Sequence, residues 1–348
     1  MKTSEVIEQL RRREDLDRDA AASLMESIIR GEIGAATLGA ILIALSMKGE
    51  RPGELAGFVD AMRRQAVDPG IDPLRHPDRI DTCGTGGDRS GTFNISTASA
   101  IVVASCGVPV VKAGNRSVSS RCGSADVLEM LGIEVSSTPE DARRSLEQAS
   151  IAFLFAQAFH PAVKNVAPVR RELGVPTAFN LIGPLSNPAR PRRQVIGVPR
   201  PELTELLAET SLMLGSERVW VVHGTDGLDE LSTTGRTRIS EGISDPQGGP
   251  GTVRTFDLHP QDVGLPLAEP SDLLGGDAAA NAAIILAVIE GRRGAPRDIV
   301  CLNAAAALLV AGVVASIQDG LERAGAAIDE GRALDTLARF RAASGPRS

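Results

Sequence analysis

Apolar residues in the first part of the chain recur at helical spacing. Between residues 34 and 49 the apolar positions include Leu38, Ile41, Leu42 and Leu45, which follow the repeat of a helix that buries one face. Glycine stands at both ends of this segment, as expected where a helix begins and ends. The pattern predicts a compact all-helical unit over roughly the first 65 residues.

The next segment has a different composition. Residues 67–78, VDPGIDPLRHPD, are rich in proline and aspartate, which form turns and end helices. Such a loop is typical of a crossing between two domains. We therefore predict a domain boundary near residue 72.

After this loop, short β-branched runs alternate with longer helical stretches, as in βα units. The expected strands are Arg79–Thr82, Val108–Lys112, Ile151–Phe155, Gln194–Val198 and Arg218–His223. The expected helices are Ser96–Ser105, Ser119–Leu131, Pro161–Leu173, Pro201–Leu214, Ala278–Glu290 and Asn303–Ala311. The last two are rich in alanine, which indicates close helix packing. The chain is therefore predicted to be of α/β class, with a small N-terminal all-helical domain plus a large α/β domain that has a mostly parallel central sheet flanked by helices.

Composition narrows the class of protein. With 348 residues, 43% of them hydrophobic, the chain can bury a substantial core. Its 44 acidic and 37 basic residues give a formal charge of −7, without the positive excess of nonspecific nucleic-acid binders. The charged first segment and the absence of a long apolar run predict a cytosolic protein with no membrane span. Cys83, Cys106, Cys122 and Cys301 show no C-x-x-C pairing and are expected to be reduced, small apolar residues.

A glycine-rich turn follows the first expected strand. In residues 81–97, DTCGTGGDRSGTFNIST, the glycines Gly84, Gly86 and Gly87 leave room for backbone N–H groups to approach a phosphate. The polar stretch Asn94 to Thr97 then stands at a helix N-terminus, where free N–H groups favour an anion. An ordinary glycine turn with a helix cap is the alternative.

A basic, hydroxyl-rich loop follows the second expected strand, within residues 108–126. Its cations and hydroxyls could surround a pyrophosphate, although a solvated basic loop is the alternative. The polar residues of this loop are Lys112, Asn115, Arg116, Ser117, Ser119, Ser120 and Arg121. Two such loops after strands match the way α/β sheets collect ligands at strand C-termini.

A third loop, within residues 221–235, carries Asp226, Asp229 and Glu230 at the end of a strand. Adjacent carboxylates repel each other, and a hard cation such as Mg²⁺ is the usual reason to place two together. A surface acidic loop is the alternative. The two anion-binding loops elsewhere in the chain favour the metal interpretation, because Mg²⁺ commonly bridges carboxylates and phosphates.

Taken together, GTGGD, NIST, KAGNRSVSS and DGLDE resemble the anthranilate phosphoribosyltransferase family of tryptophan biosynthesis. FHPA, FNLIGPLSNP and DIVCLNAAAALLVAG extend the resemblance over almost the whole chain. It implies a helical domain of residues 1–72, with about 165–190 packing on it, and an α/β domain of residues 73–164 and 191–348. It also implies a homodimer through the helical domains, and transfer of a phosphoribosyl group from phosphoribosyl pyrophosphate to the amine of anthranilate.

The resemblance also implies roles for individual residues. Phosphoribosyl pyrophosphate would be held by Gly84, Gly87, Asp88, Thr92, Asn94, Ile95, Ser96, Thr97, Lys112, Ala113, Gly114, Asn115, Arg116, Ser117, Val118, Ser119, Ser120 and Ser124. Mg²⁺, expected as two ions per active site, would be held by Ser96, Asp229 and Glu230. The residues expected to act in catalysis are Lys112, Arg116, Asp229 and Glu230.

Anthranilate would meet Gly84, Asn115 and Arg170. A guanidinium group suits its carboxylate because two N–H groups form a matching fork, but neighbouring Arg171 could exchange roles with Arg170. Family members commonly have histidine where this chain has Ala113, and a basic residue near Pro176. Both departures touch the expected path of anthranilate.

Several alternatives stay open at this point. His160 could line the aromatic substrate channel or could be a structural turn residue. A pyrimidine-nucleoside phosphorylase-like enzyme is the nearest rival function, although it needs no Mg²⁺ and would not require the acidic pair. A non-catalytic nucleic-acid-binding relative is the other rival, disfavoured by the net charge, by one tryptophan and by the absence of tyrosine.

Overall fold

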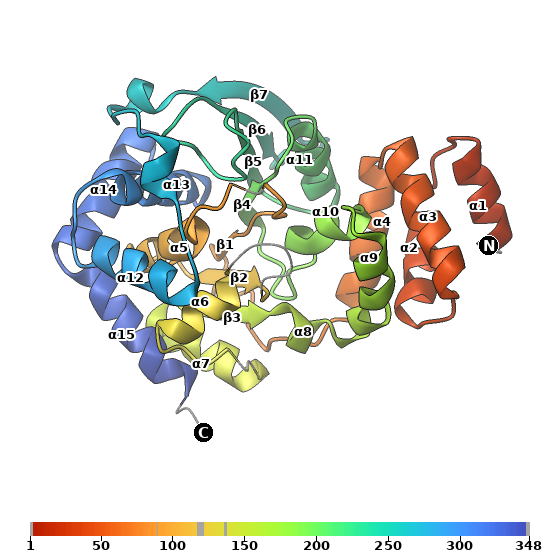
Figure 1. Cartoon of the computed structure of the whole chain (residues 1–348), viewed down its shortest axis with the longest axis horizontal. Coiled ribbons are helices and arrows are strands. Elements are labelled where there is room, and N and C mark those ends of the chain that lie inside the picture. Colours follow the sequence, from red (N-terminus) through yellow and green to blue (C-terminus); the bar gives the residue numbers. More distant parts are fainter. Residues whose placement is uncertain (1–2, 89, 117–121, 136–137, 346–348) are drawn as a thin grey trace.

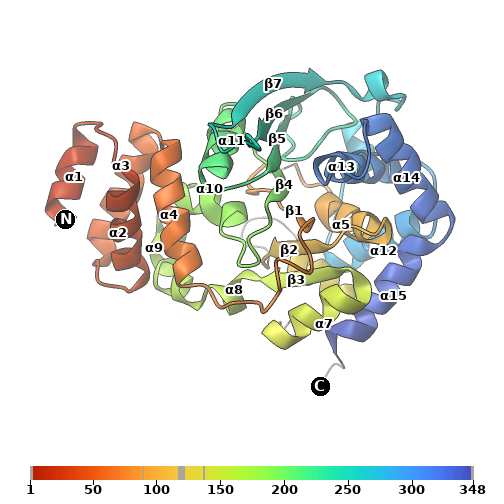
Figure 2. The same cartoon turned by 180° about the vertical axis from the view of Figure 1, so that it is seen from behind.

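The computed structural model describes residues 3–88, 90–116, 122–135 and 138–345 of the chain. It has a helical unit at the N-terminal end and a larger unit built on one twisted sheet (Figures 1 and 2). The C-terminal helices gather on the side of the sheet away from the helical unit. None of the helices in the described ranges is long and apolar enough to cross a bilayer.

The helical unit contains four successive helices. They are α1 (Thr3–Arg11), α2 (Arg18–Ile29), α3 (Ala35–Lys48) and α4 (Pro52–Arg64). The predicted helical repeat is confirmed, because Leu38, Ile41, Leu42 and Leu45 all face the core of this unit. Asp17 precedes helix α2, and its carboxylate accepts a hydrogen bond from the Ala20 amide at 2.7 Å and so caps a free N–H group.

A later segment returns to this unit and packs on it. It comprises α8 (Ala156–Phe159), the 3-10 helix η1 (Pro161–Asn165), α9 (Ala167–Leu173) and α10 (Ala178–Leu185). Val166, Val169 and Phe179 from this segment join the same apolar cluster as the N-terminal helices. The two parts of the molecule are thus linked by several crossings of the chain; the domain limits themselves stay a prediction.

The sheet has seven strands in the order β3-β2-β1-β4-β5-β6-β7, of which the first five are mutually parallel. The parallel strands are β1 (Ile80–Thr82), β2 (Val110–Gly114), β3 (Ile151–Phe155), β4 (Arg193–Gly197) and β5 (Arg218–Gly224). Each coincides with a predicted strand to within two residues. The mostly parallel sheet is therefore confirmed, and its polar loops follow the carboxyl ends of the strands.

Two strands were missed by the sequence analysis. β6 (Thr237–Ile243) and β7 (Thr252–Leu258) pair antiparallel at the edge of the sheet. β7 is largely exposed and carries Thr and Arg side chains, so it lacks the continuous apolar run that marks a buried strand.

Three helix predictions need correction. Of the expected helix Ser119–Leu131, the described residues form only the shorter α6 (Ser124–Met130), because Gly123 has extended backbone and stands as its N-cap. The expected helix Pro161–Leu173 is divided into η1 and α9 around Val166, because Pro168 fits only the first turn of a new helix, where no N–H group is needed. The expected Asn303–Ala311 is the second half of the longer α13 (Ala295–Val310).

Helices on the far face of the sheet enclose the larger core. They are α5 (Ile95–Ser105), α12 (Ala278–Ile289), α13, α14 (Ile317–Asp329) and α15 (Arg332–Ser344), with α6 (Ser124–Met130) and α7 (Pro139–Ala149) at the β3 end. Alternate residues of β5 divide the two cores: Trp220 and Val222 face these helices, whereas Val219 and Val221 face α11 (Leu203–Met213) and the helical unit. The alanine-rich packing is tight, since a Cβ on Gly320 would lie 2.8 Å from Ala305.

Candidate active site

Three polar loops meet at the carboxyl ends of the parallel strands. The glycine-rich turn follows β1, the loop from Asn115 follows β2, and the acidic loop follows β5. Since β1 lies between β2 and β4, and β4 lies beside β5, the sheet order brings these loops to one edge. Ligands of open α/β sheets bind at this edge.

The glycine turn packs directly against the acidic loop. A Cβ on Gly84 would lie 2.5 Å from the Asp229 carboxylate, and one on Gly197 would lie 1.5 Å from the Asp229 carbonyl oxygen. The Gly86 amide donates a hydrogen bond to Asp229 Oδ2 at 3.0 Å. Only glycine at residues 84 and 197 leaves room for this approach.

Asp229 and Glu230 form a pair of partly buried like charges. Burial and the nearby charge of Asp88 raise the pKa of Asp229 to about 7. Burial and the neighbouring Asp229 raise the pKa of Glu230 to about 8. A cation placed between these oxygens would remove the repulsion, so the donor set fits a hard metal ion.

The acidic pair could not enclose a metal ion by itself. No group of three or more His, Cys, Asp or Glu side chains suited to a metal occurs within the described residues. Ser96 lies close enough to Glu230 to lower the pKa of that carboxyl, and its hydroxyl could add a third oxygen. Two carboxylates and a hydroxyl leave coordination positions for phosphate oxygens and water, as is usual for Mg²⁺.

Lys112 lies beneath this cluster and is only 3% exposed. Its ammonium group donates hydrogen bonds to the Thr82 carbonyl oxygen and to Ser96 Oγ, the latter at 3.1 Å. Lys112 also lies close enough to Glu230 to favour its charged form. The geometry therefore connects β1, β2, α5 and the acidic loop through one buried cation.

A second buried network supports the strand that carries Lys112. The Asn187 amide group donates hydrogen bonds to Asp81 Oδ2 and to the Val111 carbonyl oxygen, both at 2.8 Å. Asp81 also accepts from the Ala113 amide at 3.3 Å, and burial raises its pKa to about 6. Sequence reasoning missed Asn187, although it lies in the FNLIGPLSNP segment that carried the resemblance.

The N-terminus of α5 is held from the far side of the sheet. Asn281 on α12 donates a hydrogen bond to Asn94 Oδ1 at 2.9 Å, and Asn94 in turn reaches the Cys122 carbonyl oxygen at 3.3 Å. Ile95 and Thr97 are buried. Asn281, 187 positions from Asn94, is therefore a supporting residue that no local motif revealed.

Hydroxyl groups stabilise the second half of the glycine-rich turn. Ser90, which the sequence analysis also passed over, donates a hydrogen bond to Asp88 and lies 3.2 Å from the Thr92 hydroxyl. Asp88 is thus held near Asp229 by its own loop. Gly87 adopts a φ of +90°, the region that favours glycine.

The loop after β2 is described in part. The Ser124 hydroxyl and the Ala125 amide donate to the Asn115 carbonyl oxygen, and a Cβ on Gly114 would lie 2.2 Å from Ser124 Oγ. Ala113 pairs with Leu154 in the sheet. The expected ligands Ser117, Val118, Ser119 and Ser120 lie outside the described residues.

Arg116 does not join the cluster around Lys112. Its guanidinium group forms an ion pair with Glu129 at 2.6 Å and another with Asp126 at 3.2 Å, both on α6. A role for Arg116 in stabilising pyrophosphate would require it to leave these carboxylates, and it stays a prediction.

Arg170 and Arg171 differ sharply in their surroundings. Arg170 lies over the Phe179 ring at 5.4 Å and donates to Asn180 Oδ1 at 3.3 Å, and its burial lowers its pKa. It forms no ion pair with any described residue. Arg171 is exposed. The structure thus favours Arg170 as the partner of a carboxylate ligand, with Asn180 as a neighbour that the sequence did not indicate.

Three further residues considered from the sequence, Asp226, His160 and Cys83, have local surroundings that the structure defines. Asp226 accepts hydrogen bonds from Ser232, Thr234 and the Leu228 amide, so it stabilises its own loop. His160 Nε2 lies 2.9 Å from the Ser186 carbonyl oxygen, and burial lowers the pKa of the ring. Burial raises the pKa of Cys83 to about 12, which keeps the thiol protonated.

Comparison with known proteins adds an independent finding. Residues 4–66 match the helical bundle domain of the Glycosyl transferase family, and residues 76–334 match its a/b domain. An anthranilate phosphoribosyltransferase of Moorella thermoacetica is 50% identical over 324 residues, which cover 92% of each chain. The solved anthranilate phosphoribosyltransferase of Thermus thermophilus superposes with a TM-score of 0.88 at 39% identity, covering 97% of this chain and 99% of that one. The Saccharomyces cerevisiae enzyme in complex with PRPP and Mg superposes with a TM-score of 0.82 at 26% identity, covering 94% and 92%.

Proposed function

The chain belongs to the anthranilate phosphoribosyltransferase family, and we propose on this basis that it transfers the phosphoribosyl group of phosphoribosyl pyrophosphate to the amine of anthranilate. The products are N-(5-phosphoribosyl)anthranilate and pyrophosphate, in a step of L-tryptophan biosynthesis. The observation that carries the proposal is the pair Asp229 and Glu230, set against the glycine turn and beside Ser96.

The reaction forms a bond from the anthranilate nitrogen to ribose C1 and breaks the bond from C1 to the pyrophosphate oxygen. Positive charge grows on the sugar and negative charge on the leaving group, so catalysis is mainly electrostatic. The buried Lys112 ammonium and the backbone N–H groups of the glycine turn stabilise the departing pyrophosphate. The aromatic amine, unprotonated at neutral pH, attacks C1 directly, so no covalent enzyme intermediate is needed. The nitrogen becomes cationic when it bonds to C1 and then releases one proton to water.

Ser96, Asp229 and Glu230 would hold Mg²⁺, with two ions per active site as part of the proposal. When bound, the metal neutralises charge on the pyrophosphate oxygens and orients them. Asp229 and Glu230 supply the negative charge; the Gly86 amide holds Asp229 against the glycine turn, and Ser96 lies beside Glu230.

Anthranilate would be bound by Gly84, Asn115 and Arg170. The Arg170 guanidinium, half-buried and without an ion-pair partner within the described residues, supplies a fork of N–H groups for the anthranilate carboxylate. Positioning the amine in this way contributes the entropic part of the rate enhancement. Ala113 and Pro176 leave this part of the site less polar than histidine and a basic residue would.

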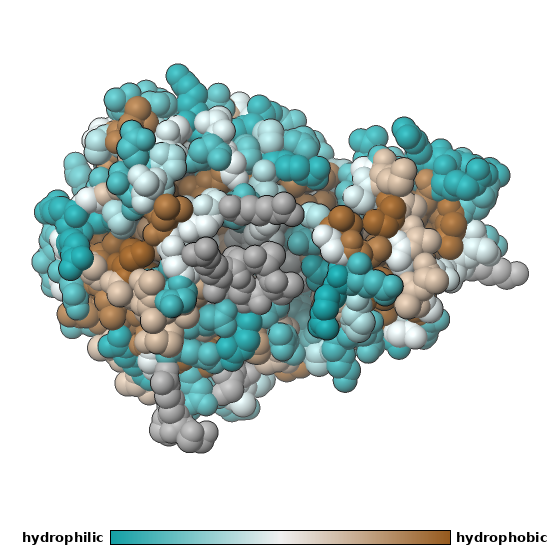
Figure 3. Space-filling view, viewed as in Figure 1, coloured by the Kyte–Doolittle hydropathy of each residue, from teal (hydrophilic) through white to brown (hydrophobic). Residues whose placement is uncertain are grey.

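The proposal includes a cytosolic homodimer formed through the helical units. The outer face of α3 supports this assembly, because Ala36, Ala40 and Met47 are exposed and Ile43 is half-buried. Figure 3 shows apolar side chains gathered over the helical unit. Light scattering coupled to gel filtration measures the mass directly, and Met47→Glu is expected to shift a dimer toward the monomer.

The test of the reaction is the loss of anthranilate fluorescence on mixing purified protein with phosphoribosyl pyrophosphate, with and without Mg²⁺. Metal-dependent loss is expected, with pyrophosphate released in equal amount. Phosphate-dependent cleavage of a pyrimidine nucleoside, measured in parallel without metal, examines the rival phosphorylase. Nucleoside cleavage without anthranilate consumption would overturn the proposal.

A further inference from the structure

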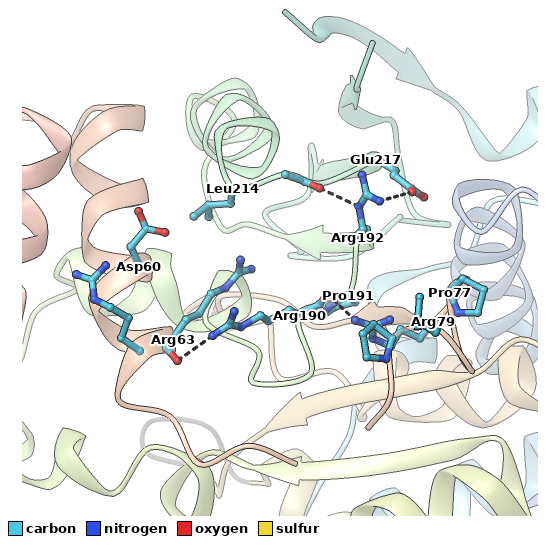
Figure 4. Close-up of a pocket in the computed structure, with 13 residues that line it drawn as sticks. Asp60, Arg63, Pro77, Arg79, Arg190, Pro191, Arg192, Leu214 and Glu217 are labelled. Carbon is cyan, nitrogen blue, oxygen red and sulfur yellow. Dashed lines mark hydrogen bonds and ion pairs between the residues drawn. The ribbon is translucent and has the colours of Figure 1, made fainter. Parts of the chain in front are cut away.

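A cavity lies at the end of the parallel strands opposite to the candidate active site. Its volume is about 590 Å³, within the range of small-molecule sites. Arg79, Arg192 and Glu217 line it, and each stands one residue before a strand, namely β1, β4 and β5 respectively. The cavity therefore opens at the amino ends of strands whose carboxyl ends carry the transferase site. The last turn of α4 forms the opposite wall (Figure 4).

The lining of this cavity is strongly basic. Five arginines face it against two carboxylates, Asp60 and Glu217, which gives a formal lining charge of +3 in a chain whose net charge is −7. The arginines are Arg63, Arg64, Arg79, Arg190 and Arg192. Both carboxylates are already engaged: Asp60 pairs with Arg18 at 2.7 Å, and Glu217 pairs with Arg192 and Arg193 at 3.0 and 3.2 Å.

Three of these arginines form no ion pair within the described part of the chain. Arg63 donates to the Leu185 carbonyl oxygen at 2.7 and 3.0 Å, Arg79 donates to carbonyl oxygens only, and Arg190 donates to the Arg63 carbonyl oxygen at 3.3 Å. A guanidinium group has five N–H donors, so each keeps donors free for a ligand. Figure 4 shows Arg63 and Arg190 approaching each other from α4 and from the segment before β4.

Placing these cations together has an electrostatic cost. Burial and the nearby charge of Arg190 lower the pKa of Arg63 to about 10, and burial and Arg192 lower the pKa of Arg79. Arg79 is only 5% exposed. Carbonyl oxygens satisfy some of the hydrogen-bond donors but do not neutralise the charge, and a bound anion would do both.

We propose that this cavity is a binding site for a small phosphate-bearing polyanion, separate from the transferase site. Arginine forks match phosphate oxygens in geometry, and arginines on several sides of the cavity suit a ligand with more than one charged group. The acidic residues that line it are occupied by arginines and leave no pair of free carboxylates for Mg²⁺. The ligand would bind here without metal.

The test is calorimetric titration of inorganic tripolyphosphate into the full-length protein, in metal-free buffer of low ionic strength. The variants are Arg190→Gln and Arg192→Gln, with Arg12→Gln, at an exposed position in the turn after α1, as a control for the change in net charge. Arg190→Gln and Arg192→Gln are each expected to weaken one binding event by about tenfold or more, because each removes charge-assisted hydrogen bonds. Arg12→Gln should match the wild type.

Transferase activity, measured on the same protein preparations, controls for folding and for an intact active site. Both cavity variants should keep kcat and the KM for phosphoribosyl pyrophosphate within about twofold of wild type, which shows that they are folded and that the lost binding event is not at the active site. Identical isotherms for wild type and both cavity variants would overturn the proposal. A variant that weakens tripolyphosphate binding only while it also raises the KM for phosphoribosyl pyrophosphate would overturn it as well, because the binding would then be at the active site. Failure of the transferase assay in the wild type would instead concern the proposed function.

Discussion

The two ends of the central sheet handle charge in opposite ways. At the carboxyl ends, Asp229 and Glu230 lie together beside backbone N–H groups and the buried Lys112. At the amino ends, Arg63, Arg79 and Arg190 crowd together while the nearby carboxylates are engaged elsewhere. Mixed charges with free carboxylates suit a metal and a leaving group whose charge changes during reaction. A predominantly positive lining suits an anion that only binds.

A cluster of like charges indicates a ligand site only when no neighbouring group of the protein already neutralises or hydrogen bonds to those charges. Repulsion between Asp229 and Glu230 persists in the described residues, as does repulsion between Arg63 and Arg190. Asp226, by contrast, has the same charge and lies in the same loop, but hydrogen bonds from its own loop satisfy it. Four predictions, from the largest expected effect to the smallest, sharpen this contrast.

The largest effect is expected for Asp229→Asn, which keeps the shape of the side chain and removes its charge. We expect kcat to fall by about 10²–10³-fold at saturating Mg²⁺, because a group that acts electrostatically at the leaving group is lost. The measurement is steady-state anthranilate consumption as a function of Mg²⁺ concentration.

Asp226→Asn is the matched control for this variant. It removes an equal charge from the same loop, and we expect a lower Tm with little change in the Mg²⁺ dependence. If Asp226→Asn and Asp229→Asn reduced kcat equally, the assignment of the metal to Asp229 would be wrong.

A smaller effect is expected for Arg170→Gln. The kcat/KM for anthranilate should fall by roughly 10–100-fold, because a charge-assisted hydrogen bond to the substrate carboxylate is lost. The KM for phosphoribosyl pyrophosphate should stay the same. Arg171→Gln, an equal change one residue away on the exposed side, should leave both parameters within about twofold; the reverse result would exchange the two roles.

Asn187→Ala tests the buried hydrogen bonds that join Asn187 to strands β1 and β2. Asp81 and the Val111 carbonyl oxygen would each lose a buried hydrogen-bond donor, so we expect the free energy of unfolding to fall by about 1–3 kcal/mol. Urea denaturation measures this loss. Asn165→Ala removes a single hydrogen bond to the Ile29 carbonyl oxygen at an exposed position and should cost less. Equal losses would contradict the importance of the buried network.

The smallest effect is a pH dependence of stability that belongs to the carboxyl-end site alone. Folding raises the pKa of Asp229 and Glu230 from ordinary carboxyl values to about 7 and 8, so the folded protein keeps protons that the unfolded chain releases. Stability of the metal-free protein should therefore fall as pH rises from about 5 to about 8, by several degrees in Tm.

Mg²⁺ should reverse this loss at pH 8 and have little effect at pH 5, where the carboxyls are protonated. The double variant Asp229→Asn with Glu230→Gln should lose this part of the pH dependence. Arg190→Gln should keep it, because arginine does not titrate in this range. A Tm that responds to Mg²⁺ equally at both pH values would argue against these two carboxyls as its ligands.

The sequence by itself determined the helical character of the N-terminal unit, the five parallel strands and the types of residue at the site. The helical repeat of Leu38 to Leu45, the five apolar strands and the polar loops that follow them are each contained in a short window, where the geometry of one helix or strand sets the spacing. The antiparallel strands β6 and β7 were not predicted: β7 is an exposed edge strand, and β6 is buried but interrupts its apolar residues with Arg238, Ser240 and Glu241, so neither has a continuous apolar run. Within the site, the glycine turn, Lys112 and the acidic pair were all visible in the sequence.

The tertiary structure decided which of several similar residues face one another. It distinguished the surroundings of Asp229 from those of Asp226, and the surroundings of Arg170 from those of Arg171. Residues close in sequence point in different directions once their element packs. Asn187 reaches Asp81 across 106 positions, and the arginine cavity is lined by segments from Asp60 to Glu217 that carry no shared motif. Such contacts depend on how strands and helices are ordered in space, and local spacing holds no information on that order.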